Sequence, residues 1–159
     1  MRAMILSLSR RALLGALLAI VAVPSLARAQ GTEKFKTGKL TIVSAGKRNV
    51  FTVELALTDR QQQRGLMFRR SMAPDAGMLF DYVTPTRITM WMKNTFIPLD
   101  MIFIGADGKV VDIAERAVPQ SETIIPSKVP ARAVLELNGG TAQRLGIKVG
   151  DVVETDALK

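Results

Sequence analysis

The apolar residues of this chain come in short runs that are separated by glycine, proline, asparagine and aspartate. From residue 39 onward, most of these runs alternate apolar with polar residues, which is the period of a strand with one buried face. An α/β sheet would need several helices of about 10 residues or more to cross between parallel strands, and the pattern contains none. It predicts a mainly β domain, either an antiparallel β-sandwich or a partly open barrel, with one or two short helices.

Two pairs of runs have the features of β-hairpins. Residues 40–43 and 50–57 flank a glycine-containing turn, and residues 99–104 and 110–114 flank Asp107-Gly108. An Asp-Gly pair favours a tight turn because it tolerates positive φ angles. Further strands are expected at 78–82, 88–92, 133–137 and 152–154, with Thr84-Pro85-Thr86 ending the first of them.

A short helix is expected after the second run. Thr58 and Gln61 form a capping-box pattern, in which each side chain binds a free backbone amide of the other residue, and Gly65 can end the helix. One further helical turn is expected at 141–145. Residues 115–130 contain three prolines and read as a long surface loop.

The first 29 residues have the organisation of a cleavable signal peptide. Arg2, Arg10 and Arg11 form a positive start, 12–23 an apolar run, and Ala27-Arg28-Ala29 a cleavage pattern. The apolar run is shorter than the roughly 20 residues of a membrane-spanning helix. Adjacent arginines are also typical of twin-arginine export, so both export routes stay open. We expect a periplasmic or secreted protein with a flexible lead-in at 30–38 and a single domain at 39–159.

Composition excludes several kinds of chemistry. The chain has no histidine and no cysteine, which removes disulfides, the usual zinc ligands and every Ser-His or Cys-His nucleophile pair. Four of its 22 basic residues, and none of its acids, lie in the leader, so cleavage lowers the net charge from +8 to +4. No dense basic cluster remains, and a nucleic-acid partner is therefore not expected.

The stretch from Thr89 to Ile104 holds the only tryptophan and a polar corner between two apolar runs. We expect a ligand site at this corner, because an exposed tryptophan offers a stacking face and nearby polar groups orient a ligand. The candidate ligand-binding residues are Arg64, Trp91, Lys93, Asn94 and Asp100.

Structural roles remain open for the same residues. Trp91 could belong to the core, Lys93 to a solvated turn, and Asp100 could cap loop amides or pair with Lys93. Glu54 is either solvated or directed at a partner across the sheet.

Four blocks of sequence carry a family resemblance. They are Arg64-Gly65-Leu66-Met67, Gly77-Met78-Leu79-Phe80, Trp91-Met92-Lys93-Asn94-Thr95 and Ile97-Pro98-Leu99-Asp100. In this order they resemble the DUF192 family, a domain of unknown function, from about Val50 to Gly150-Asp151. The resemblance implies a compact mainly β domain that is often exported in bacteria. It implies no catalytic residue, cofactor or substrate.

Three functions fit these observations. The first is a non-enzymatic binding module for a small polar ligand, a glycan or a peptide. The second is an envelope hydrolase or transferase that uses Lys93 or an acid; the available acids are Glu54, Asp81, Asp100, Glu115 and Glu136. The third is copper(I) handling by methionine sulfur, with no site assigned. We identify no catalytic residue, metal ligand or cofactor.

Overall fold

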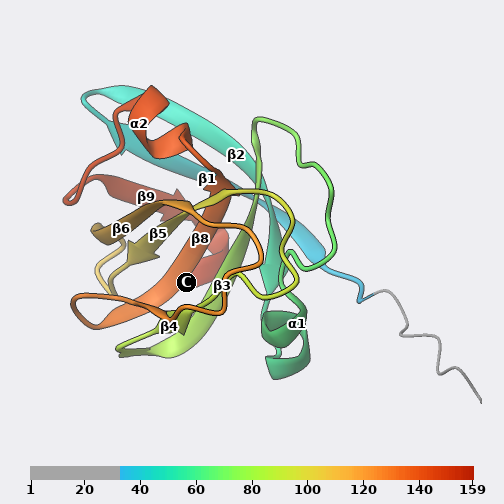
Figure 1. Cartoon of the computed structure of the whole chain (residues 1–159). Helices are drawn as coiled ribbons and strands as arrows, with labels where there is room; N and C mark the ends of the chain where they lie inside the picture. Colours follow the sequence, from blue (N-terminus) through green and yellow to red (C-terminus); the bar gives the residue numbers. More distant parts are fainter. Residues whose placement is uncertain (1–32) are drawn as a thin grey trace, which may run out of the picture. The chain divides into compact units, whose positions relative to one another are not determined.

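The computed structural model describes residues 33–159, in which most of the regular structure is β (Figure 1). The signal peptide expected at residues 1–29 lies outside the described residues. The strands are β1 (Lys36–Ser44), β2 (Lys47–Ala56), β3 (Ala76–Thr86), β4 (Thr89–Met90), β5 (Leu99–Ile104), β6 (Val110–Ala117), β7 (Ile125–Pro126), β8 (Ala131–Asn138) and β9 (Val152–Thr155). The helices are α1 (Asp59–Arg64) and α2 (Thr141–Leu145), with a 3-10 turn at Asp156–Leu158. In this part of the chain no helix is long and apolar enough to cross a membrane.

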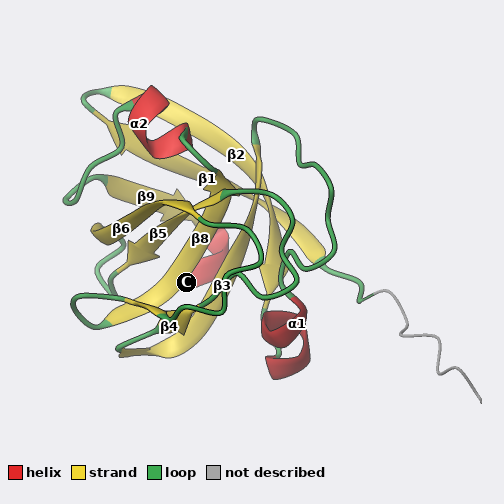
Figure 2. Cartoon of the chain, viewed as in Figure 1, coloured by secondary structure: helices red, strands yellow, loops and turns green. Residues whose placement is uncertain are grey.

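The main sheet has seven strands in the order β6-β5-β8-β3-β2-β1-β9, and β4 pairs with β7 in a small second sheet. Neighbouring strands run antiparallel, except that β2 and β3 run parallel and are connected through α1. Figure 2 shows the strands of the main sheet curling around a common interior. The predicted mainly β class, with a partly open barrel and short helices, is confirmed, and the parallel pair is an addition to it.

The two edges of the main sheet meet at the turn before β6. Val153 N–H donates to Gly108 O at 2.8 Å, and Val110 N–H donates to Asp151 O at 2.9 Å. Lys109 and Val152 form an isolated bridge between the same segments. Because an open edge leaves backbone groups unpaired, these bonds favour the curled, partly closed arrangement.

Each face of the central strands contacts a different apolar cluster. The interior cluster includes Leu40, Phe51, Leu79, Ile102 and Leu135. The opposite face contributes Met78, Phe80, Met101, Phe103 and Val134, and it is covered by residues 88–97 together with Ile125. Since successive side chains of a strand point to opposite faces, β5 is buried along its whole length.

Local signals locate the first helix correctly. Thr58 accepts a hydrogen bond from Gln61 N–H, the Gln61 side chain accepts one from Thr58 N–H, and Gly65 ends α1 with a φ of 44°. The capping box is therefore confirmed, and the hairpin turn at Asp107-Gly108 and the helical turn at α2 are confirmed as well.

Several predicted boundaries are wrong. The loop expected over 115–130 is interrupted by strand residues, because β6 continues to Ala117 and β7 covers Ile125–Pro126. β1 begins at Lys36, within the segment expected to be a lead-in, because Lys36 pairs with Leu55 of β2. β3 continues to Thr86, because a register shift between Asp81 and Thr86 leaves Pro85 outside the regular ladder, where its missing N–H costs nothing. The strand expected over 88–92 is reduced to Thr89–Met90, since its partner β7 has only two residues.

Candidate functional site

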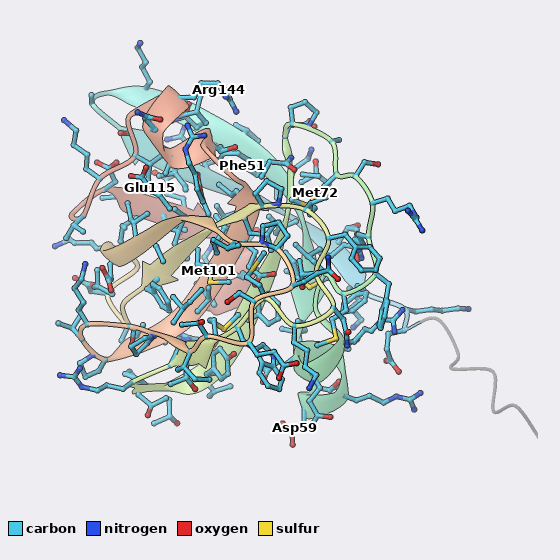
Figure 3. All side chains as sticks on the ribbon, in the orientation of Figure 1. Phe51, Asp59, Met72, Met101, Glu115 and Arg144 are labelled. Carbon is cyan, nitrogen blue, oxygen red and sulfur yellow. The ribbon has the colours of Figure 1, made fainter. Side chains whose placement is uncertain are left out.

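A pocket of about 90 Å³ opens between the end of α1, strand β3 and the segment that follows β4. Side chains from distant parts of the sequence line it, among them Arg64, Phe80, Tyr82, Trp91, Lys93 and Glu136. The pocket is continuous with a wider groove of about 440 Å³. The two spaces share several lining residues, among them Gln62, Tyr82, Met90 and Trp91. Asp59 at the start of α1, labelled in Figure 3, lies at the outer groove.

Helix α1 is attached to the sheet through Gln62, and this attachment positions Arg64. The Gln62 side-chain amide donates to Asp81 O at 2.8 Å and to Ala56 O at 3.4 Å. Arg64 then lies at the rim, with its guanidinium carbon 4.7 Å from the centroid of the Phe68 ring. Phe68 in turn contacts Phe96 edge to face, at 6.0 Å between ring centroids. The rim therefore combines cationic and exposed aromatic side chains.

Trp91 and Lys93 face solvent at the mouth of the pocket. Trp91 is 44 % exposed, which excludes a core role for it. Lys93 Nζ lies 5.3 Å from the centroid of the Trp91 ring and 3.4 Å from the Glu122 carboxylate. The pair with Glu122 is exposed and therefore contributes little to stability.

Asn94 does not line the pocket but shapes its rim. Its backbone has a φ of 56°, a left-handed conformation that asparagine tolerates better than most residues. The Asn94 carbonyl accepts a 2.8 Å hydrogen bond from Phe68 N–H, and its side-chain amide lies 3.9 Å from the Met67 sulfur. These contacts hold the segment after α1 against the segment after β4.

Asp100 lies away from the pocket and has a structural role. Its side chain is fully buried and accepts hydrogen bonds from the backbone amides of Arg116, Gly140 and Ala142, at 2.8, 2.9 and 2.8 Å. Of the two structural roles considered for Asp100, the structure therefore shows the capping of backbone amides. It forms no pair with Lys93, whose carboxylate partner is Glu122. The structure thus brings together Arg64, Trp91 and Lys93, and leaves Asn94 at the rim and Asp100 elsewhere.

Glu136 forms part of the pocket and was not among the candidate binding residues. It is 4 % exposed and lies on the same face of the sheet as Met78 and Met101, its neighbours on β3 and β5. Burial raises the pKa of Glu136 to about 8. The one available sequence signal was an acid within the apolar run Ala133–Leu137. A buried acid is usually either paired with another side chain or part of a functional site.

The pKa of Tyr82 is also raised in this pocket. Burial, followed by the charge of Glu136, raises the pKa of Tyr82 to about 12, and its hydroxyl donates to the Met90 sulfur at 3.5 Å. At neutral pH the inner pocket therefore contains a neutral phenol and a largely protonated carboxyl group.

The other acids considered for catalysis lie outside the inner pocket. Glu54 accepts two 2.6 Å hydrogen bonds from Arg69, and Asp81 pairs with Arg132 at 3.3 Å. Glu115 is exposed on β6. Since Glu136 is the single acid among the inner lining residues, this pocket lacks the carboxylate pair that a two-carboxylate glycosidase needs.

Metal-binding side chains are also sparse. Within residues 33–159, no group of three or more Asp or Glu side chains is arranged to hold an ion. Met67 and Met90 line the pocket, whereas Met78, Met92 and Met101 are fully buried in the apolar cluster. Figure 3 labels Met101 in the interior of the molecule.

Comparison with known proteins finds similarity along most of the chain. The DUF192 family model, described as an uncharacterized ACR, matches residues 40–155. A crystal structure from Sinorhizobium meliloti 1021, described as a candidate transcription regulator, is 48% identical, with a TM-score of 0.77, over 80% of this chain and 99% of that one. A protein of unknown function from Novosphingobium aromaticivorans DSM 12444 is 45% identical, with a TM-score of 0.74, over 88% and 99%. No protein with a curated description matches.

Proposed function

The chain belongs to the DUF192 family, and we propose that it acts as a non-enzymatic binding module for a small polar ligand, a glycan or a peptide. The family is described only as uncharacterized, so membership brings no activity with it. We therefore base the function on the pocket and its lining residues.

The convergence of Arg64, Trp91 and Lys93 on one pocket is the observation that carries the proposal. An exposed indole ring supplies apolar contact area, and the two cations and the neighbouring glutamines supply directional polar contacts. The lining group Glu136 is 4 % exposed and has no hydrogen-bond or ion-pair partner among residues 33–159, as expected of a group that a ligand can satisfy.

We place this function in the cell envelope, in the periplasm or outside the cell. The support is the signal-peptide pattern of residues 1–29. Cell fractionation tests the location, and replacement of Arg10 and Arg11 by lysine tests the route. Unchanged export of that variant would exclude the twin-arginine route.

Trp91 provides a direct test of binding because it is the only tryptophan of the chain. Its fluorescence should change and saturate with at least one member of a panel of organic acids, sugars and short peptides. Lys93→Gln should weaken that binding about tenfold, whereas Lys47→Gln, at the exposed start of β2, should leave it unchanged. Equal effects of the two substitutions would exclude this pocket as the site.

A second candidate is an envelope hydrolase or transferase that uses Glu136 or Lys93 in acid-base chemistry. The supporting observation is the pKa of Glu136, raised by burial to about 8, which suits a general acid near neutral pH. Chromogenic esters, phosphoesters and glycosides test this function. Turnover that is lost in Glu136→Gln would replace the binding module with an enzyme.

Copper(I) handling by methionine sulfur is less well supported. Met67 and Met90 line the pocket, but their sulfur atoms already contact Asn94 and Tyr82. Copper analysis of the protein from copper-grown cells is the test. Less than about a tenth of an equivalent would exclude the function.

A further inference from the structure

We propose that this pocket binds the carboxylate of a small organic acid with an apolar tail, and that the carboxyl group of Glu136 donates a hydrogen bond to it. This inference rests on the proposed binding function and specifies the chemical class of the ligand. Three features of the pocket support it: a buried acid, an excess of positive charge and an apolar outer groove.

The Glu136 side chain has apolar neighbours within the sheet. Met78 of β3 and Met101 of β5 lie opposite it and are fully buried. Burial is the one cause that raises its pKa, with no hydrogen bond or neighbouring charge acting against it in the described chain. A protonated carboxyl group offers one O–H donor, and an ionised carboxylate is the acceptor with which it forms a short, strong hydrogen bond.

Positive charge predominates in the inner pocket. Apart from Glu136, the charged side chains that line it are Arg64, from the end of α1, and Lys93, from the segment after β4. The partner of Lys93 is the exposed Glu122, at 3.4 Å, and an incoming anion can compete with such a pair. With Glu136 protonated, the pocket therefore favours an anion over a neutral or cationic group.

The outer groove suits an apolar extension of the same ligand. Trp91, Met90 and Ile124 form its apolar part, and Trp91 and Ile124 are exposed. Polar side chains complete the lining: Asp59, Gln62, Gln63, Tyr82 and Thr89. The inner pocket of about 90 Å³ has room for a headgroup, and the groove of about 440 Å³ has room for a tail. Because Met90 and Trp91 line both spaces, one molecule can occupy them together.

The charged and titratable groups that share the inner pocket with Glu136 determine how binding responds to pH. They are Tyr82 from β3, Arg64 from α1 and Lys93 from the segment after β4, while its strand neighbours Met78 and Met101 are uncharged. Tyr82, with a pKa raised to about 12 by burial and by Glu136, stays neutral up to pH 9. Ionisation of Glu136 removes the donor and adds a negative charge beside the ligand. Affinity for a carboxylate should therefore be highest below the pKa of Glu136 and decline above it.

Titration of Trp91 fluorescence with hexanoate, hexanol and hexylamine tests the ligand class. Hexanoate should saturate the signal near pH 6.5, and the alcohol and the amine should bind at least about tenfold more weakly. Raising the pH to about 9 should weaken hexanoate binding about tenfold, as follows from a pKa of about 8.

Glu136→Gln separates this role from a general pH effect. The amide keeps an N–H donor but cannot titrate, so the variant should bind hexanoate more weakly than wild type, with similar affinity near pH 6.5 and pH 9. Far-UV circular dichroism checks that it is folded, and Glu115→Gln controls for loss of an exposed acid away from the pocket. The same pH dependence in wild type and Glu136→Gln would overturn the role of Glu136.

The remaining outcomes distinguish the ligand class from the binding function. Hexanol, hexylamine or a neutral sugar binding more tightly than hexanoate would overturn the carboxylate inference and leave the binding module in place. If neither these probes nor any member of the wider panel changes the fluorescence, both proposals fail.

Discussion

Asp100 Oδ2 accepts a 2.8 Å hydrogen bond from the backbone N–H of Ala142, so a fully buried carboxylate on β5 fixes the first turn of α2. The other oxygen of the same group accepts from Arg116 and Gly140. One side chain thus connects the ends of β5, β6 and β8 to the short helix.

Removal of this carboxylate should destabilise the fold strongly. Asp100→Ala leaves three amides without their acceptor, and we expect a loss of roughly 3–5 kcal/mol in the free energy of unfolding. Urea denaturation measures the change. Glu115→Ala, an exposed acid on β6, is the control and should change stability by less than about 0.5 kcal/mol. Similar losses in both variants would contradict the capping role.

Stability should fall as pH rises, because of Glu136. Its pKa of about 8 in the folded protein lies above the ordinary value of 4.5, so the folded state retains a proton that the unfolded state releases. This difference contributes roughly 5 kcal/mol to the free energy of unfolding. The contribution is fully present below about pH 4.5 and is lost as the pH rises through 8. Urea unfolding near pH 5 and pH 9 should show this decrease in the free energy of unfolding in wild type and not in Glu136→Gln. An equal pH dependence in both proteins would argue against a buried, unpaired acid.

The Glu54–Arg69 pair should contribute more than an exposed pair of similar geometry. Its side chains are 28% and 31% exposed, whereas those of Glu154 and Arg48 are 48% and 58% exposed. Double-mutant cycles should give a coupling energy of about 1 kcal/mol for Glu54–Arg69, and a smaller, more salt-sensitive one for the exposed pair. The reverse order would show that burial does not decide the strength of these two pairs.

Gly65→Ala should destabilise the end of α1 and distort the pocket. Gly65 has a φ of 44°, and an added Cβ would lie 3.2 Å from Phe80, a lining residue. We expect a loss of about 1–2 kcal/mol and a changed Trp91 emission spectrum. Gly38→Ala is the matched control, since its added Cβ would make ordinary contacts with Leu55. A change in emission from Gly38→Ala as large as that from Gly65→Ala would contradict this assignment.

Local sequence signals were sufficient for the class of fold and for many of its elements. The capping box at Thr58, the Asp107-Gly108 turn and the alternation in β2 each act within a few residues, so they can be recognised without knowledge of distant contacts. The exposure of Trp91 and Lys93 stayed open at the level of sequence, because the apolar ring of Trp91 is equally suited to a core, and the folded chain places both side chains in solvent.

Tertiary structure alone decided how those elements combine. The parallel pairing of β2 with β3 and the meeting of the sheet edges near Lys109 depend on contacts between distant segments. The same holds for the site. Asp100 lies only a few residues beyond Lys93, yet the amides of Gly140 and Ala142 hold it in the interior.

Glu136 shows most clearly which properties cannot be predicted from the sequence. The residue pattern indicates an acid within an apolar strand, which makes Glu136 unusual but does not define its role. Its role depends on which side chains from β3, α1 and the segment after β4 surround it, because a pKa is determined by desolvation and by neighbouring charges in space. The residue pattern therefore predicts a mainly β domain with a polar corner, and only the folded chain places this corner beside a pocket that holds a buried acid with a raised pKa.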